Sequence, residues 1–230
     1  MRARPNAPAL AQAIAADGPP RVEGALSTDR LARETWRTWA NAVTALRVVA
    51  ALACFVVSTL RRDEAWSFVG LAIYWALDVA DGALARALGQ ETRIGAQLDI
   101  LSDRLLLGAF YATFLRAHPG MAIPVALHLV QFVVLDQYLS QQFLRWPCLS
   151  PNYFHEVDRT IWEWNWSAPA KVANGALATT AIVAAAALGW SWIVPAAVCA
   201  PVIGLKLGSI ARLASLPPPE PWLRRAGGRR

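Results

Sequence analysis

Apolar residues gather in six stretches of the chain, and short polar segments separate them. A helix needs about 20 residues to cross the roughly 30 Å of hydrocarbon in a bilayer, and each stretch is close to that length. The pattern therefore predicts an all-α fold, a polytopic membrane protein with six transmembrane helices. These are expected over residues 42–60, 65–82, 94–115, 121–144, 170–189 and 191–211.

The chain before the first apolar stretch divides into two parts. Residues 1–27 are rich in Ala, Pro and Gly without periodicity, which predicts a mobile N-terminal tail. Residues 28–40 place tryptophans near one face and arginines on the other, which predicts an amphipathic juxtamembrane helix at the headgroup level. We expect the membrane domain over 41–211 and a basic C-terminal tail over 212–230.

The composition agrees with burial in lipid. Hydrophobic residues make up 56% of the chain and charged residues only 17%, whereas soluble domains carry about 25% charged residues. The net charge of +6 comes mostly from Lys and Arg in the predicted tails and in the loops 83–93 and 145–171. By the positive-inside rule, both termini are predicted to face the cytoplasm, as in a multi-pass protein of the inner (cytoplasmic) membrane. This distribution explains the basicity without nucleic acid as a partner.

The three cysteines, Cys54, Cys148 and Cys199, lack the CxxC spacing of metal and redox sites. No disulfide framework is expected from them. They are predicted to be inert packing residues.

Four acids interrupt the second and third apolar stretches: Asp78, Asp81, Asp99 and Asp103. Spacings of three and four place each pair on one helix face, and the segment between the pairs is long enough to turn the chain back. Four carboxylates brought together would repel one another unless cations lie between them. Oxygen ligands of this kind suit Mg²⁺, Mn²⁺ or Ca²⁺, and two metal ions can serve a phosphoryl displacement. The pattern predicts a divalent-metal site.

The alternative is that these acids are solvated at helix ends or pair with Arg86, Arg93 or Arg104. Two glycines weigh against it. Gly82 directly follows Asp81, and Gly95 precedes Asp99 by one turn, so a ligand or another backbone has room to approach both places.

The same residues resemble the signature of the CDP-alcohol phosphatidyltransferase family. All eight fixed positions agree in Asp78-x2-Asp81-Gly82-x2-Ala85-Arg86-x8-Gly95-x3-Asp99-x3-Asp103. Upstream, Asn41-x2-Thr44-x2-Arg47 is similar to the element at the start of the family's first membrane helix. The resemblance covers roughly residues 28–211 and leaves the two tails outside it.

The resemblance implies a reaction and a cofactor. A phosphatidyl group moves from a CDP-linked lipid, CDP-diacylglycerol, to the hydroxyl of a small alcohol, and CMP leaves. By this resemblance, Asp78, Asp81 and Asp99 would hold two Mg²⁺ or Mn²⁺ ions, and Asp103 would ligate metal and act as general base. The residues implied in CDP binding are Asn41, Thr44, Gly82, Ala85, Arg86 and Gly95. A homodimer is also implied by the resemblance.

The acceptor alcohol is indicated less directly. Arg104 and Lys171 would form a cationic pocket that favours a phosphorylated acceptor such as glycerol 3-phosphate or inositol phosphate. In the alternative, Arg104 pairs with an acid, Lys171 extends to the interface, and the acceptor is inositol or serine. Asp136 lies inside the fourth apolar stretch and is predicted to line the acceptor pocket or to pair with Lys206.

Two other function classes fit part of the pattern. A transporter also uses acids within the membrane, but the chain shows no clear inverted repeats or broken helices. A non-catalytic scaffold would not need all four aspartates. The Trp-rich loop 145–169 is expected either to rest on the bilayer or to cover the active site.

Overall fold

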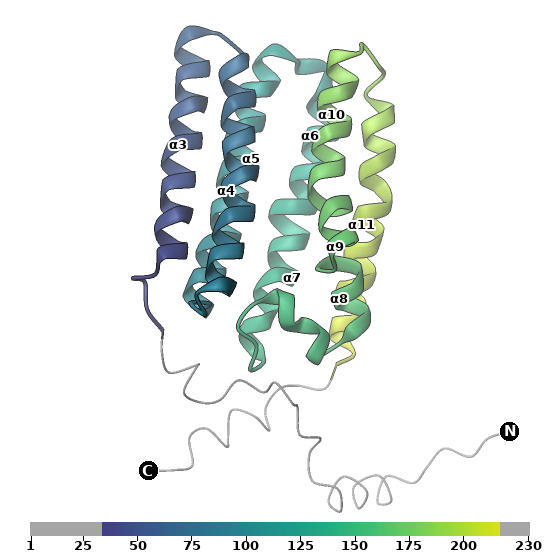
Figure 1. Ribbon diagram of the computed structural model, residues 1–230. Helices are drawn as coiled ribbons and strands as arrows, with labels where there is room; N and C mark the ends of the chain where they lie inside the picture. The colour runs from purple at the N-terminus through teal and green to yellow at the C-terminus, as the bar shows by residue number, and fades with distance from the viewer. Residues whose placement is uncertain (1–33, 217–230) are drawn as a thin grey trace, which may run out of the picture.

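The computed structural model describes residues 34–216, and in this part of the chain helices are joined by turns and loops, without strands. Long helical rods stand side by side (Figure 1). The first three are α3 (Trp39–Arg61), α4 (Ala65–Ala87) and α5 (Arg93–Ala117). The fourth runs through η1 (Pro119–Met121), α6 (Ala122–Leu129), η2 (Val130–Asp136), α7 (Gln137–Gln141) and η3 (Gln142–Arg145). The last two comprise α9 (Ala168–Lys171), η5 (Val172–Leu177) and α10 (Ala178–Ala187), and then α11 (Ile193–Ala214).

Five of these rods are long and apolar enough to cross a membrane: 39–61, 65–87, 119–145, 168–187 and 193–214. The multi-pass prediction is confirmed by them. The remaining rod, α5, has 25 residues but carries Asp99, Asp103 and Arg104, which lower its hydropathy. Its role as a sixth span stays a prediction. Large apolar side chains such as Val49, Leu60 and Val79 are more than half exposed on the bundle surface, as lipid contact requires.

Local sequence explains where the first helices begin. The Thr38 side chain accepts a hydrogen bond from the backbone N–H of Asn41, and that of Thr92 accepts one from Gly95, so threonine caps the start of both α3 and α5. The α4–α5 turn includes Gly89 at a φ of 60°, a conformation that glycine adopts without steric cost.

The amphipathic helix expected over residues 28–40 is corrected where the structure describes it. Residues 28–33 lie outside the described part of the chain, and residues 34–38 are not helical. Thr38 has an extended backbone and caps the spanning helix, so the chain enters α3 at Trp39 instead of continuing an earlier helix. The predicted tails, 1–27 and most of 212–230, also lie outside the described residues.

Two apolar clusters hold the bundle together. One is aromatic and lies between α3, α4, α5, α6 and α10, where Phe110 and Phe114 are fully buried. The other lies where the segment 146–167 folds against α5, α7 and α11, and it includes Phe154, Ile161 and Trp166. This segment contains η4 (Pro151–Glu156) and α8 (Arg159–Asn165). It closes the same end of the bundle at which α3 begins and α11 ends (Figure 1).

The cysteines behave as predicted. Cys54, Cys148 and Cys199 are free and buried. Burial raises the pKa of the Cys148 thiol to about 11, so this thiol stays protonated and unreactive at neutral pH.

Candidate active site

A cavity of about 610 Å³ opens at the end of the bundle that the segment 146–167 covers. Helices α4 and α5 form one wall, and η2, α7, η5 and residues 149–152 form the other. Both η2 and η5 are π-helical, with a wider turn than an α-helix. Such turns often occur at functional sites, and here they place Phe132, Asp136 and Asn174 in the cavity wall.

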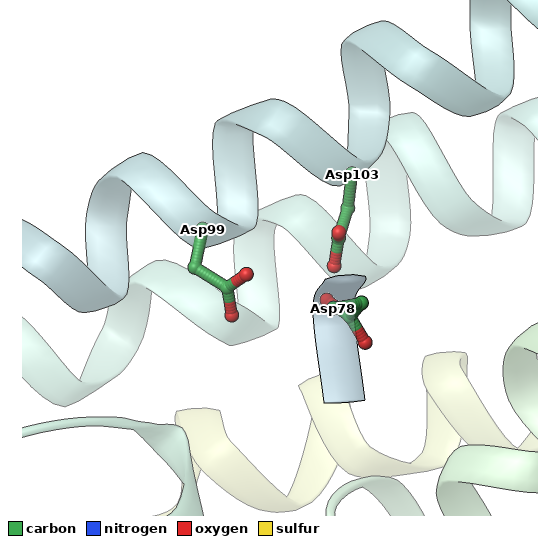
Figure 2. Close-up of side chains that lie close together, drawn as sticks. All are labelled: Asp78, Asp99 and Asp103. Atoms are coloured by element: carbon green, nitrogen blue, oxygen red, sulfur yellow. The ribbon is translucent and has the colours of Figure 1, made fainter. Parts of the chain in front are cut away.

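Three of the four predicted metal ligands come together on the first wall. Asp99 and Asp103 project from successive turns of α5 toward Asp78 of α4 (Figure 2). Each offers a carboxylate oxygen, and these oxygens lie within 4.8 Å of one another. The side chains of Asp78 and Asp99 keep 39% and 43% of their surface exposed, so their oxygens remain accessible from the cavity.

Asp81 is placed differently from the other three. It lies one turn along α4, is buried, and accepts a 2.8 Å hydrogen bond from the Thr44 hydroxyl. It is not part of the group of three, although it lines the same cavity. The structure therefore brings Asp78, Asp99 and Asp103 into a close group and leaves Asp81 beside it.

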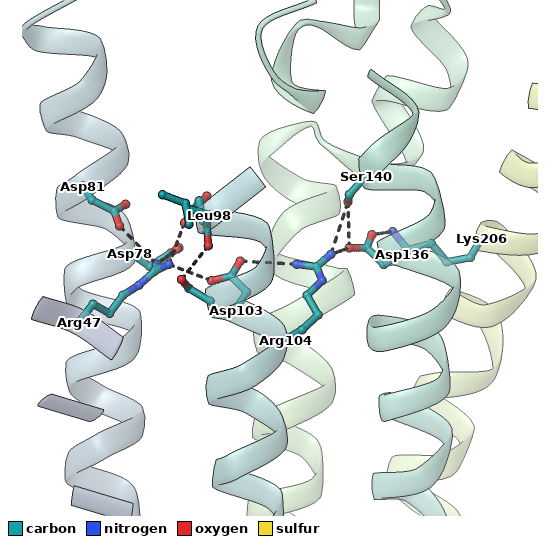
Figure 3. A network of polar contacts seen from close by, with 11 residues as sticks. Arg47, Asp78, Asp81, Leu98, Asp103, Arg104, Asp136, Ser140 and Lys206 are labelled. Carbon is teal, nitrogen blue, oxygen red and sulfur yellow. Dashed lines mark hydrogen bonds and ion pairs between the residues drawn. The ribbon is translucent and has the colours of Figure 1, made fainter. Parts of the chain in front are cut away.

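Arg47 lies at the centre of the aspartates and was not among the site residues predicted from the sequence. Its guanidinium pairs with Asp78 and lies 2.8 Å from Asp99, while the distances to Asp103 and Asp81 are 3.4 and 3.6 Å (Figure 3). The side chain is fully buried. The sequence contained one signal for this position: Arg47 is a charged residue in an otherwise apolar helix, and such a residue normally faces a partner inside the bundle.

The donor set fits a divalent cation. Four carboxylates surround a single guanidinium, so negative charge remains in excess. Buried Oδ1 of Asp103 has no hydrogen-bond partner and only a longer ion pair with Arg47. Hard oxygen ligands with spare capacity are what Mg²⁺ and Mn²⁺ prefer. Metal binding by these residues stays a prediction.

The residues implied in CDP binding also line the cavity, next to the aspartates: Asn41, Thr44, Gly82, Ala85, Arg86 and Gly95. A Cβ on Gly95 would lie 2.9 Å from the Asn41 side-chain oxygen, so glycine allows α3 and α5 to approach here. The Arg86 guanidinium lies over Gly82, where a Cβ would meet it at 3.3 Å. Their contact with a nucleotide stays a prediction.

Two of the three residues proposed for the acceptor, Arg104 and Asp136, meet beside Asp103, whereas Lys171 bonds Asn152 instead. Arg104 pairs with Asp136, and Nζ of Lys206 lies 2.5 Å from the second oxygen of Asp136 (Figure 3). The sequence left open whether Arg104 binds an acceptor phosphate or pairs with an acid, and in the structure it pairs with Asp136. Asp136 both lines the cavity and pairs with Lys206, so its two predicted roles coincide.

The Trp-rich segment contributes directly to the cavity. Residues 149–152 form part of its wall, and Asn152 accepts a 2.6 Å hydrogen bond from Lys171. Arg145 and Arg159 do not line the cavity. The segment therefore covers the site, and its aromatic residues Phe154 and Trp166 are buried in doing so.

One ion pair outside the cavity fixes this segment to α11. The Arg212 guanidinium donates to both carboxylate oxygens of Asp158 at 2.9 Å. Burial by itself would raise the pKa of Asp158. The hydrogen bonds from Arg212 and from the backbone N–H groups of Ile161 and Thr160 outweigh it and hold that pKa below its ordinary value.

Fold and site together define a class of protein: a helical membrane protein with an acidic cluster and a polar cavity at one end of its bundle. The sequence model of the CDP-alcohol phosphatidyltransferase family matches residues 37–208. This is well over half of the chain, and the chain belongs to that family. The family assignment made from the signature is confirmed.

Two curated relatives match shorter parts of the chain. A phosphatidylinositol phosphate synthase of Mycobacteroides abscessus is 42% identical over 69 residues, which is 30% of this chain and 30% of the relative. A CDP-diacylglycerol–inositol 3-phosphatidyltransferase of Drosophila melanogaster is 36% identical over 97 residues, 38% of this chain and 42% of the relative. The matched segments thus span less than half of either relative. No solved structure matches the chain significantly.

Proposed function

We propose that the protein transfers a phosphatidyl group from CDP-diacylglycerol to the hydroxyl of an inositol-type alcohol and releases CMP. Family membership supports the reaction class. Both curated relatives carry inositol in their names, which supports the acceptor class over glycerol 3-phosphate or serine. The single observation that carries the proposal is the meeting of Asp78, Asp99 and Asp103 at a cavity that Arg86 also lines.

The arrangement divides the chemistry between the two cavity walls. Arg86 is suited to bind the diphosphate, since a guanidinium donates hydrogen bonds in a fixed fork. The acceptor would enter from the side of Asp136 and Asn174, opposite the aspartates. Its hydroxyl would then approach Asp103, which lies between the two sides.

The proposed reaction exchanges one bond to phosphorus for another. The acceptor oxygen forms a bond to the phosphorus that carries the lipid, and the bond from that phosphorus to the bridging oxygen of CMP breaks. The hydroxyl proton passes to Asp103, and CMP leaves with the bridging oxygen. Asp78, Asp99 and Asp103, with Asp81 beside them, would hold Mg²⁺ or Mn²⁺, which supplies charge stabilisation on the phosphates and acidifies the hydroxyl.

The location and the oligomeric state of the protein are also part of this proposal. We propose that the protein lies in the inner (cytoplasmic) membrane with both termini and the active site on the cytoplasmic side, because its basic loops are at that end. A homodimer is proposed from the family resemblance.

The test is CMP release and lipid formation by purified protein in detergent. CDP-diacylglycerol is supplied with Mg²⁺ or Mn²⁺ and, in separate reactions, inositol, inositol phosphate, glycerol 3-phosphate or serine. Lipid products are identified by mass spectrometry. An inositol lipid formed only when metal is present supports the proposal. No CMP release with any acceptor, or a product from serine or glycerol 3-phosphate alone, contradicts it.

A further inference from the structure

The acceptor side of the cavity contains a buried carboxylate between two cations. Asp136 accepts from Arg104 through Oδ2 and from Lys206 at 2.5 Å through Oδ1. Ser140 donates a third hydrogen bond at 3.2 Å. Figure 3 shows this group as a continuous row that reaches from α5 to α11. Both carboxylate oxygens of Asp136 thus accept hydrogen bonds inside the protein.

Arg104 is held through its two terminal nitrogens, while its buried Nε has no hydrogen-bond partner. Its guanidinium lies over the Phe132 ring at 4.2 Å, and its other terminal nitrogen is 3.7 Å from Asp103. Two carboxylates therefore share one guanidinium. A phosphate group arriving at Arg104 would have to displace Asp136 and would meet its negative charge at short range.

Lys206 is also removed from ligand binding. Its side chain is fully buried, and Nζ donates a second hydrogen bond to Asn165 at 2.8 Å. Asn165 in turn donates to Ser209 at 2.8 Å. Lys206 is thus committed to Asp136 and Asn165 and does not line the cavity.

Among the described cations that line the cavity, Arg86 and Lys171 then remain. Arg86 lies beside Gly82 on the wall proposed for the diphosphate. The Lys171 ammonium is hydrogen-bonded to Asn152 and lies within electrostatic reach of Asp78 and Asp99. The acceptor side consequently offers little uncompensated positive charge.

Neutral hydrogen-bonding groups take the place of cations on this side. Amide and hydroxyl side chains line it: Ser140, Ser150, Asn152, Asn165, Asn174 and Thr179. Buried Oγ of Ser150 has no hydrogen-bond partner. Such groups both donate and accept, and they suit the hydroxyls of a polyol.

We propose that Asp136 is a specificity-determining residue, which occupies Arg104 and Lys206 so that the site selects an uncharged polyol, inositol, over its phosphorylated counterpart. The inference rests on the proposed function and narrows its acceptor class. Of the acceptors that the sequence left open, it favours inositol, which carries no phosphate. Asp136 acts here through Arg104, by deciding whether that guanidinium is available to a phosphate.

The test is a competition in one tube between inositol and inositol phosphate, each with a different isotope label, at limiting CDP-diacylglycerol. The two lipid products give the ratio of the two kcat/KM values, which does not depend on how much of the protein is folded. The wild-type protein is expected to favour inositol. In Asp136→Asn the ratio should move toward inositol phosphate by about tenfold or more, since one charge-assisted hydrogen bond becomes available.

Two further variants make the result specific. Asp136→Asn leaves the buried Lys206 without its acid. The double variant Asp136→Asn/Lys206→Met is therefore tested beside it, because it frees Arg104 without leaving an unpaired lysine. It should shift the product ratio in the same direction. Asp158→Asn is the matched control, because it also removes an arginine-paired acid but lies outside the cavity. Its ratio should equal that of the wild type.

The outcomes separate this inference from the proposed function. A wild-type preference for inositol phosphate, or an unchanged ratio in both Asp136 variants, overturns the inference and leaves the transferase in place. A shift of equal size in Asp158→Asn overturns it as well, because the effect would then be one of overall charge. No inositol lipid from either acceptor overturns the proposed function and this inference with it.

Discussion

Two ionic clusters meet at neighbouring residues of α5 and have opposite character. Around Arg47, four carboxylates surround one guanidinium, and two of them are about two-fifths exposed to the cavity. Around Asp136, one carboxylate is enclosed by two cations, with side chains at most 10% exposed. The first cluster has negative charge to spare and remains accessible; the second is satisfied internally.

The difference explains how one cavity can bind charged groups on one wall and neutral groups on the other. Buried ions are costly unless they are paired and hydrogen-bonded. The Asp136 cluster meets that requirement with protein groups alone, so it is suited to a fixed structural role. The Arg47 cluster meets it only in part, so we expect it to complete its coordination with external cations. The predictions below test this contrast, beginning with the largest effect.

The largest effect is expected at the residue between the two clusters. Asp103→Asn should lower the rate of CMP release by about 10²- to 10⁴-fold, the range that a positioned general base contributes. The measurement is kcat with CDP-diacylglycerol and inositol at saturating Mg²⁺. Asp158→Asn should remain near the wild-type rate. A loss smaller than about threefold in Asp103→Asn would be incompatible with the role of general base.

The acid-rich cluster should depend on its one internal cation. Arg47→Met is expected to destabilise the metal-free protein by about 3–5 kcal/mol, because breaking a buried ion pair leaves uncompensated charge. Added Mn²⁺ should then raise the melting temperature of the variant more than that of the wild type, since the ion replaces the lost charge. Thermal unfolding in detergent, with and without Mn²⁺, measures both effects.

The control for Arg47 is the same pair of measurements on Lys206→Met in the second cluster. That variant is also expected to be destabilised, but Mn²⁺ should shift its melting temperature no more than that of the wild type. If Mn²⁺ gave Arg47→Met the smaller shift, Arg47 would be supporting the metal ligands instead of substituting for the metal.

A smaller effect is expected where α3 and α5 approach each other beside the acid-rich cluster. In Gly95→Ala the new methyl group would lie 2.9 Å from Oδ1 of Asn41 and 3.0 Å from Oγ1 of Thr92. We expect a loss of about 1–3 kcal/mol in the free energy of unfolding and a raised KM for CDP-diacylglycerol, as for other overpacked sites. Gly108→Ala on the same helix is the control, because a Cβ there meets nothing within 4 Å and the residue does not line the cavity. Equal effects in the two variants would remove the steric argument.

The smallest effect concerns the ion pair outside both clusters. Asp158 has a lowered pKa in the folded protein, so its stabilising contribution is present above its ordinary pKa, about 3.9, and is lost as the pH falls through the lowered value. The difference in melting temperature between wild type and Asp158→Asn should therefore shrink as the pH is lowered from about 6 to about 3. A constant difference over that range would show that the carboxylate charge contributes nothing.

Much of the fold was predictable because its signals are local. The predicted stretches 42–60 and 94–115 correspond to α3 and α5, since the length of an apolar run sets the length of a helix in lipid. The start of α3 was less predictable. Residues 34–38 carry an amphipathic pattern but are not helical. Thr38 caps α3, so the helix begins only at Trp39.

The chain by itself determined the helical class, the family signature and the placing of aspartates one turn apart, because each depends on residues close in sequence. Tertiary structure alone decided that Arg47 lies among all four aspartates and that Asp136 pairs with Arg104. It likewise decided that Asp136 pairs with Lys206, 70 residues further along the chain, which the sequence had left as one of two alternatives. It also decided that residues 149–152 form a wall of the cavity. The physical reason is that a buried charge takes the partner that helix packing brings to it, and spacing along the chain does not encode that choice.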